Sequence, residues 1–338
     1  MGGPIIRTEG VRKSFGDVHA LTGVDLEVSQ GAVFGLLGPN GAGKTTTVRI
    51  LTTLLPLDSG TAEVTGLDVV EDAEALRFRI GLAGQFAAVD DNLTGLENLM
   101  LVGMLYHLSR AEAKRRGGEI LERFDLSDAA DRPARTYSGG MRRRLDVAAS
   151  LVGRPEVLFL DEPTTGLDPR SRADVWEFIR ELQADGTTLL LTTQYLEEAD
   201  VLADRIAVID GGAVIAEGTA DELKAKIGGE VLELHVASKE ETTRAAEILA
   251  GLGTGDHTVD PDTGFVRVHA GPDGTAVVFE AVRRLDGSKI WIEDLALHKP
   301  TLDDVFLTLT GRTAEDVTGE EPVATSGRRD RKKKESRT

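Results

Sequence analysis

A glycine-rich segment, Gly38–Thr45 (GPNGAGKT), restricts the fold of this chain more than any other part of its sequence. It follows an apolar run typical of a buried strand, Val33–Leu37, and leads into a helical pattern, Thr46–Leu55. Its glycines let the backbone approach an anion and aim N–H groups at phosphate oxygens, and the helix presents its positive end to the same anion. Such a match arises by chance in about one or two per cent of chains of this length. The segment therefore predicts a strand–loop–helix unit that binds a nucleotide within an α/β fold.

Two residues of this loop are expected to act on the phosphates directly. Lys44 places a fixed cation beside the β and γ phosphates, and the Thr45 hydroxyl is a ligand for Mg²⁺. The predicted cofactors are ATP and Mg²⁺. The predicted ATP contacts of the loop are Gly38, Pro39, Asn40, Gly41, Ala42, Gly43, Lys44, Thr45 and Thr46.

A second apolar run, Val157–Leu160, ends in two adjacent acids, Asp161 and Glu162. Asp161 at the strand end can hold Mg²⁺ through its water shell, and Glu162 can polarise a water in line with the γ-phosphate. Strands that end in solvated acids are common, so this pattern alone is ambiguous. Because it lies downstream of the phosphate loop, it predicts hydrolysis of the nucleotide, with Glu162 and Lys44 as catalytic residues.

Composition and charge exclude several classes of protein. The chain has 338 residues, 41% of them hydrophobic, which suits two domains with substantial cores. It has no cysteine, which excludes disulfides, thiolate catalysis and cysteine-ligated zinc. Its net charge of −18 opposes nucleic-acid binding. No apolar run approaches the roughly 20 residues of a membrane helix, and no secretory signal is visible.

The residue pattern divides the chain into two domains and a tail. Residues 1–229 alternate short apolar runs with amphipathic segments, as α/β layering requires, and a stretch at about 86–145 contains helical patterns only. Residues 230–312 predict a small α+β domain with a regulatory or dimerisation role, called the small domain below. Residues 313–338 are almost free of apolar side chains, and Ser326–Thr338 has seven Lys or Arg against two acids, so we expect a disordered basic tail.

Further landmarks occur in a fixed order around these motifs. They are Phe15, Gln85 in Gly84-Gln85-Phe86, Tyr137-Ser138-Gly139-Gly140-Met141, and Thr165-Gly166-Leu167-Asp168. Over residues 5–227 the whole set resembles the ATP-binding subunits of ABC transporters. The resemblance implies a P-loop NTPase (RecA-like) nucleotide-binding domain with a helical subdomain. One difference is Tyr137, where the family usually has leucine; we expect it to alter packing more than phosphate contact.

The resemblance implies a role for each landmark. Two copies of the chain pair head to tail, and ATP on one copy is covered by Ser138, Gly139 and Gly140 of the other. Phe15 stacks on the adenine. Gln85 contacts the metal and the γ-phosphate and passes closure to the membrane partner, and Asp168 reaches across the dimer interface.

A second difference from the family is Gln194, where a histidine is usual. Glutamine can donate an amide hydrogen bond to the γ-phosphate, but it cannot carry a proton or a positive charge near neutral pH. Gln194 is therefore predicted as a catalytic contact, together with Gln85. More of the hydrolytic chemistry then depends on Glu162.

Three segments carry a narrower resemblance, namely residues 193–200 (TQYLEEAD), 202–210 (LADRIAVID) and 299–311 (KPTLDDVFLTLTG). They are similar to the daunorubicin/doxorubicin-resistance ATPases, whose subunits energise antibiotic export through a separate membrane protein. We expect an ATPase subunit of a drug exporter, with an integral membrane permease and a second copy as partners, on the cytoplasmic face of the cell membrane. The alternatives are an ABC transporter for a lipid, a polysaccharide or an imported nutrient, or a soluble ABC ATPase that does not transport.

Three other features are interpreted as structural. The six histidines show no metal-binding spacing, so none is assigned as a ligand. Trp291, between Ile290 and Ile292, is expected to pack within a strand. The segment at 299–311 is expected to form an amphipathic helix that closes the small domain, with a regulatory role as an equal alternative.

Overall fold

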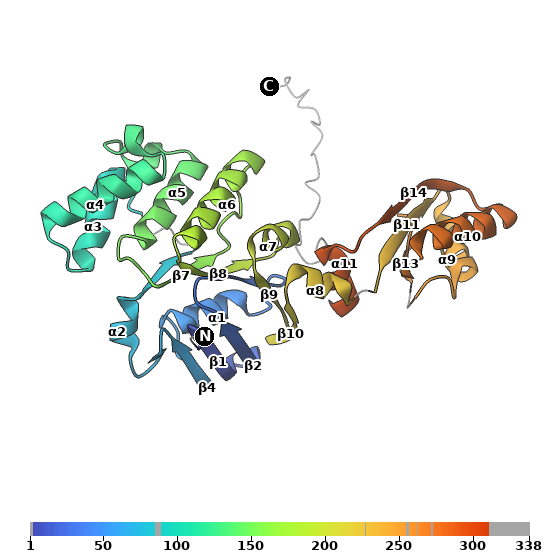
Figure 1. Ribbon diagram of the computed structural model, residues 1–338, viewed down its shortest axis with the longest axis horizontal. Coiled ribbons are helices and arrows are strands. Elements are labelled where there is room, and N and C mark those ends of the chain that lie inside the picture. The colour runs from blue at the N-terminus through green and yellow to red at the C-terminus, as the bar shows by residue number, and fades with distance from the viewer. Residues whose placement is uncertain are drawn as a thin grey trace, which may run out of the picture.

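The computed structural model describes residues 3–84, 89–226, 228–254, 257–261, 263–271 and 273–310. Its largest sheet has six strands in the order β10-β9-β3-β8-β7-β6 (Figure 1). All pairs in it are parallel except β10 with β9. The strands are β3 (Val33–Leu37), β6 (Ile80–Ala83), β7 (Val157–Asp161), β8 (Thr188–Thr193), β9 (Arg205–Asp210) and β10 (Ala213–Gly218).

Every residue of β3, β7 and β8 is buried, because both faces of the sheet are covered. Alternate residues of β7 enter different cores: Leu158 and Leu160 face one, and Val157 and Phe159 face the other. The continuous apolar runs in the sequence therefore correspond to two-sided burial.

A second, antiparallel sheet covers one of these faces. Its order is β2-β1-β4-β5, from β1 (Ile6–Phe15), β2 (Val18–Val28), β4 (Ser59–Val64) and β5 (Leu67–Asp68). Helix α1 (Lys44–Leu51) shares its core, since Val48, Ile50 and Leu51 cluster with residues of both sheets. The first residue of α1 is thereby fixed at the carboxyl end of β3.

Helices cover the other face. They are α3 (Gly95–Leu105), α4 (Arg110–Arg123), α5 (Gly139–Ser150), α6 (Pro169–Ala184) and α7 (Leu196–Leu202), and Figure 1 shows α3, α4 and α5 together at one end of the molecule. Helix α2 (Ala73–Arg77) lies on the side of the antiparallel sheet, because its buried Leu76 belongs to the core that the two sheets share. Thr94 caps α3 in a reciprocal capping box with Glu97, whereas Ser109 caps α4 by accepting the Glu112 N–H. The described residues from α3 to α5 form helices and the turns that join them.

The small domain is an antiparallel sheet of order β12-β13-β11-β14 with two helices. Its elements are β11 (Glu230–Val236), α9 (Thr242–Leu249), β12 (Thr258–Asp260), β13 (Phe265–Gly271), α10 (Gly274–Gly287) and β14 (Ile292–His298). The two helices pack on the sheet through a core that includes Leu234, Leu249 and Leu285. The expectation for Trp291 is wrong: it precedes β14 and is 76% exposed, and only its neighbour Ile290 is buried.

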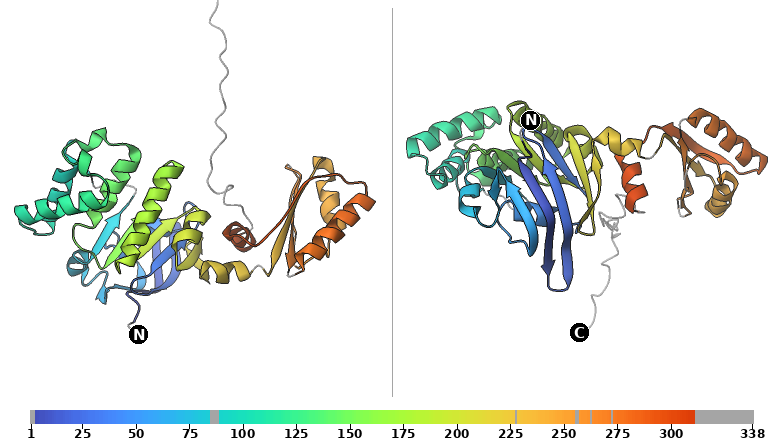
Figure 2. Two further views of the ribbon diagram at one scale, coloured as in Figure 1. Left: turned by 45° about the horizontal axis from the view of Figure 1, so that its top comes forward. Right: turned by 60° about the horizontal axis from the view of Figure 1, so that its bottom comes forward.

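The last helix described, α11 (Leu302–Thr310), does not close the small domain as expected. Its apolar side chains Leu302, Val305 and Phe306 cluster with Leu196 of α7 and Leu223 of α8 (Ala220–Ala225). An amphipathic pattern fixes which face of a helix is buried but not the surface that buries it. The chain thus leaves α8, builds the small domain, and returns to α8 (Figure 2). Gly229 and Glu230 on the way out and Lys299 and Pro300 on the way back line one pocket.

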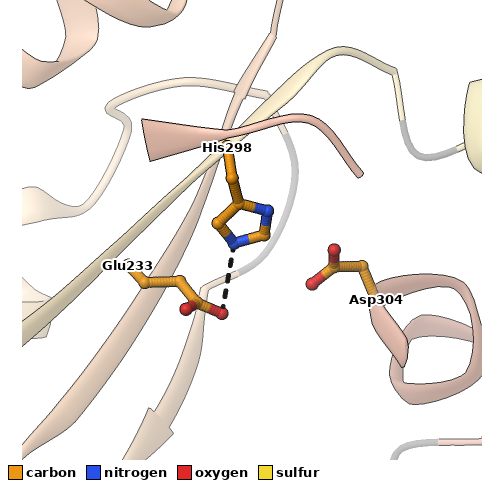
Figure 3. Close-up of side chains that lie close together, drawn as sticks. All are labelled: Glu233, His298 and Asp304. Carbon is orange, nitrogen blue, oxygen red and sulfur yellow. Dashed lines mark ion pairs between the residues drawn. The ribbon is translucent and has the colours of Figure 1, made fainter. Parts of the chain in front are cut away.

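Ion pairs link α11 to the small sheet at this return point. Arg267 of β13 lies between Glu233 of β11 (Nε–Oε1, 2.9 Å) and Asp304 of α11 (Nη1–Oδ1, 3.2 Å). His298 of β14 approaches the same Glu233 oxygen at 3.4 Å (Figure 3). Although Glu233, His298 and Asp304 are side chains that can bind metals, the cation between the two carboxylates is Arg267.

Two sequence predictions concern residues outside the described ranges, namely Gln85 and the basic tail at 313–338. Within those ranges, no helix combines the length and apolar character needed to cross a membrane.

Candidate active site

The glycine-rich loop joins the carboxyl end of β3 to α1, and two of its glycines have no room for a side chain. A Cβ on Gly38 would collide with the carbonyl oxygen of Ile209. Gly43, at φ +111°, is the N-cap of α1, and a Cβ there would lie 2.6 Å from Leu21 Cδ2. The close approach of β9 and β2 therefore requires glycine and holds the loop at the positive end of α1.

Lys44 extends across this loop. Its Nζ donates hydrogen bonds to the carbonyls of Gly38 (2.7 Å) and Pro39 (3.0 Å) and lies 3.5 Å from Glu162 Oε1. Burial lowers the pKa of Lys44, while the nearby carboxylates of Glu162 and Asp161 oppose that shift. The amine is thus a buried cation held beside the backbone of the phosphate loop.

Asp161 ends β7 at the same edge of the sheet. Its Oδ1 accepts hydrogen bonds from Thr45 Oγ1 (3.2 Å) and from Thr192 Oγ1 of β8 (2.6 Å). A hydroxyl and a carboxylate this close are hard oxygen ligands of the kind that Mg²⁺ prefers, so the residues present fit that ion. Thr192 is fully buried, and the sequence analysis did not identify it.

Glu162 has an unusual backbone. Its φ is +52°, in the left-handed region that non-glycine residues seldom adopt. Its N–H donates to the carbonyl (3.2 Å) and to the hydroxyl (3.0 Å) of Thr192, and Thr165 Oγ1 donates to its Oε2 (3.3 Å). The turn brings the carboxylate back toward Lys44. One pocket is lined by this acid and by Ala20, Pro39, Asn40, Gly41, Gly43, Lys44, Thr45 and Thr46.

Two further predicted residues are Gln194 and Phe15. Gln194 directly follows β8, and its Oε1 is buried with no hydrogen-bond partner among the described residues. Phe15 ends β1 and is half exposed, with Lys13 Nζ 5.7 Å from its ring centroid. An exposed ring in this position is free to stack on a planar ligand.

Residues Tyr137–Met141, called the signature segment below, lead into α5, called the signature helix. The Ser138 hydroxyl accepts the N–H of Met141 as N-cap, and a Cβ on Gly140 would lie 2.7 Å from Ser171 Oγ. Tyr137 is buried and donates its hydroxyl to the carbonyl of Ala129, so the replacement of leucine there is absorbed by packing. Asp168 caps α6 and accepts hydrogen bonds from the N–H and the hydroxyl of Ser171.

A buried acid that the sequence did not single out lies behind the site. Glu198 of α7 is fully buried, and its Oε1 accepts hydrogen bonds from Thr164 Oγ1 (2.8 Å) and Trp176 Nε1 (3.1 Å). Burial raises the pKa of Glu198. In the sequence it cannot be distinguished from its exposed neighbour Glu197, because both lie in one amphipathic helix.

Loop, acids and signature helix together define a nucleotide-binding subunit of the ABC class, and comparisons with known proteins agree. Residues 21–165 match the ABC transporter family. A daunorubicin resistance ATP-binding protein of Streptomyces coeruleorubidus is 53% identical over 322 residues, which are 95% of this chain and 99% of that protein. A daunorubicin/doxorubicin resistance ATP-binding protein of Streptomyces peucetius is 50% identical over 317 residues, 94% of this chain and 95% of that protein.

Among solved structures, the dimeric post-hydrolysis state of an ATP-binding cassette bound to ADP and Pi matches with a TM-score of 0.58 and 26% identity. The match covers 63% of this chain and 98% of that one. The chain belongs to the daunorubicin/doxorubicin-resistance family of ABC transporter ATP-binding proteins. These matches confirm the predicted α/β P-loop fold and the prediction of an ATP-hydrolysing transporter subunit.

Proposed function

We propose that this chain binds Mg-ATP on the Gly38–Thr45 loop and couples its hydrolysis to the export of a hydrophobic drug or antibiotic through a separate membrane permease. The observation that supports this most is the convergence of Lys44, Asp161 and Glu162 at the carboxyl ends of β3 and β7. The cargo class is supported by relatives that are named for daunorubicin resistance. Nothing in the described site recognises a cargo, so its choice belongs to the permease.

Each residue has a role that follows from its position. Lys44 offers a fixed cation to the terminal phosphates, and the loop N–H groups orient them. Thr45 and Asp161 would hold Mg²⁺, which supplies neutralisation of phosphate charge. Glu162 accepts a proton from the attacking water, and Gln194 donates an amide hydrogen bond without taking up charge.

The same proposal includes a second copy of the chain. Ser138, Gly139 and Gly140 begin a helix of twelve residues, a second place where backbone N–H groups can meet phosphate. Asp168 caps the neighbouring α6 and lies exposed beside them. A solved relative that is dimeric with ADP and Pi supports a head-to-tail pair in which these residues cover the partner's nucleotide.

An exposed apolar patch offers a surface for the permease. We define the α3 patch as Phe78, Leu101, Met104 and Leu105, all exposed. The Phe78 ring lies 6.1 Å from that of Tyr106, whose hydroxyl donates to the carbonyl of Ile80 in β6. Since β6 leads directly to Gly84 and Gln85, a cytoplasmic segment of the permease on this patch would press on the strand that ends at the nucleotide site.

The test is to co-express the full chain with a candidate permease from the same organism and to prepare inverted vesicles. We expect Mg-ATP-dependent daunorubicin uptake and co-purification of the two proteins. Phe78→Asp should lose both but retain soluble ATPase activity, whereas Phe279→Asp, at a 73% exposed site in the small domain, should retain all three. Failure of the parent to retain Mg-ATP would exclude the ATPase role. Uptake by Phe78→Asp equal to the parent's would exclude the patch.

A further inference from the structure

One arginine connects the signature helix to the hydrolytic strand within a single chain. Arg143 of α5 directs its guanidinium at the carboxyl ends of β6 and β7, and its side chain is 14% exposed. It donates to the carbonyls of Pro163 (Nε, 2.7 Å), Gly84 (Nη1, 2.6 Å), Glu162 (Nη2, 3.2 Å) and Asp161 (Nη2, 3.3 Å). Asp146, one turn along α5, pairs with Nη1 at 3.3 Å.

These contacts meet at the strained part of the site. Glu162 holds φ +52°, and its N–H is fixed by Thr192 on one side. Arg143 fixes the carbonyls of residues 161–163 on the other side, so the peptide groups around the acid are held from both directions. A left-handed backbone at a non-glycine residue persists only when its surroundings hold it in place.

The same guanidinium also contacts the residue before Gln85. Gly84 directly follows β6, and its carbonyl accepts the shortest of the four hydrogen bonds that Arg143 donates to backbone carbonyls. Arg143 lies five positions after Ser138 on one helix, so a rotation of α5 moves both residues. Lysine cannot replace this contact set, because a rigid planar fork reaches several carbonyls at once and an ammonium does not.

We propose that Arg143 is a positioning residue for hydrolysis: it aligns Glu162 only while α5 and the Gly84 end of β6 are in their docked places. This rests on the proposed role of Glu162 as the group that activates water. Each site's hydrolysis is thereby linked to the position of the signature helix that serves the other copy's ATP. Arg143 is not among the described residues that line the pocket at the phosphate loop, so its loss should lower turnover and leave nucleotide affinity unchanged.

Arg144 provides a matched control. It is the next residue on α5, is also partly buried, and donates to a backbone carbonyl, that of Phe124 (3.2 Å), within the helical region. A role that is only structural would affect both arginines alike. A role in positioning affects Arg143 alone.

The experiment compares Arg143→Lys and Arg143→Ala with Arg144→Lys and Arg144→Ala in the full chain. It measures Mg-ATP dissociation constants, kcat, KM and thermal unfolding. For Arg143→Lys we expect kcat to fall about 10- to 100-fold, as for a misplaced catalytic group, with affinity within about twofold of the parent. Added ethylguanidinium should restore part of the kcat of Arg143→Ala in a saturable way and should do nothing for Arg144→Ala.

A second measurement keeps the proposal testable if Arg143→Ala folds poorly. In the Glu162→Gln background the Arg143→Lys change should lower kcat no further, because both residues act on one step. Full kcat in Arg143→Lys, equal losses in the Arg144 variants, or additive losses with Glu162→Gln would each overturn the role of Arg143. Failure of the proposed function differs from all of these: the parent itself would not hydrolyse ATP, or Glu162→Gln would turn over like the parent.

Discussion

The six-stranded sheet and the sheet of the small domain differ in how much charge they bury. At the carboxyl ends of β3, β7 and β8, Lys44, Asp161 and Glu162 are almost wholly buried, and Glu198 lies buried behind them. In the small domain the buried residues of the described strands and helices are apolar, apart from Thr242 and from Asp304 of α11, which pairs with Arg267. Burial of charge is costly unless it is paired. The six-stranded sheet retains that cost at the nucleotide site, whereas the described core between the small-domain sheet and its helices α9 and α10 is apolar.

The largest expected effect of this contrast is at Glu162. Glu162→Gln should lower kcat by about 10²- to 10⁴-fold, the usual contribution of a general base, because an amide cannot accept the proton of water. Nucleotide binding should persist, and gel filtration should show a dimer in ATP. Steady-state ATPase assays check the turnover. Activity near the parent's would remove Glu162 from the mechanism and place the chemistry elsewhere.

The next effect concerns the junction between the two regions. Phe306→Ala should reduce the free energy of unfolding by about 3–5 kcal/mol, since it deletes a buried ring from the core that α11 shares with α7 and α8. Leu309→Ala, at an exposed position of the same helix, is the control and should change little. Urea unfolding of the full chain measures both. Equal effects of the two changes would mean that α11 does not dock as described.

A third prediction concerns Lys44, the buried cation of the phosphate loop. Lys44→Ala should weaken Mg-ATP binding by roughly 10- to 100-fold, as for a lost hydrogen bond to a charged group worth about 1.5–3 kcal/mol. It should also abolish ATP-dependent dimerisation. Equilibrium binding and gel filtration check these outcomes. A dimer that forms with ATP in Lys44→Ala as it does in Glu162→Gln counts against the shared nucleotide site.

The smallest effect is a pH dependence from Glu198. Burial raises the folded-state pKa of Glu198 above the ordinary value of a glutamate, so its contribution to stability is lost as pH rises from the unfolded-state pKa through the folded-state pKa. Glu198→Gln cannot titrate, and its Oε1 can still accept from Thr164 and Trp176. As pH rises, the free energy of unfolding of the variant should increase relative to that of the parent, by about 1.4 kcal/mol for each unit by which burial raises the Glu198 pKa. Urea unfolding between pH 4 and 8 measures both free energies of unfolding. A difference between variant and parent that stays constant over this range would contradict the prediction.

Local patterns in the sequence predicted the parts of the fold that depend on local chemistry. The loop glycines and the strand that ends in Asp161 both carry their signal within a few residues. The prediction for Trp291 was wrong because isoleucine on both sides indicates the interior of a strand. In the structure the strand begins one residue later, and the Trp291 side chain is exposed to solvent.

Other parts of the site could not be predicted, for physical reasons. Arg143 donates to backbone carbonyls, which every residue type presents, so no side-chain pattern marks its partners. The left-handed turn at Glu162 depends on Thr192, thirty residues away in sequence. The surface on which α11 docks is also set by the tertiary fold, because many apolar grooves suit the same amphipathic face.

The return of α11 to α8 has a consequence for modularity. Because the small domain leaves and re-enters at one place, beside Gly229 and Lys299, it is topologically an insertion between two helices that already pack together. Such a module can be enlarged, exchanged or replaced by a short linker without exposing Leu196 or Leu223. Helix α11 would remain packed on α7 and α8 of the ATP-binding domain. A different domain could therefore be inserted between α8 and α11 without disturbing the nucleotide site.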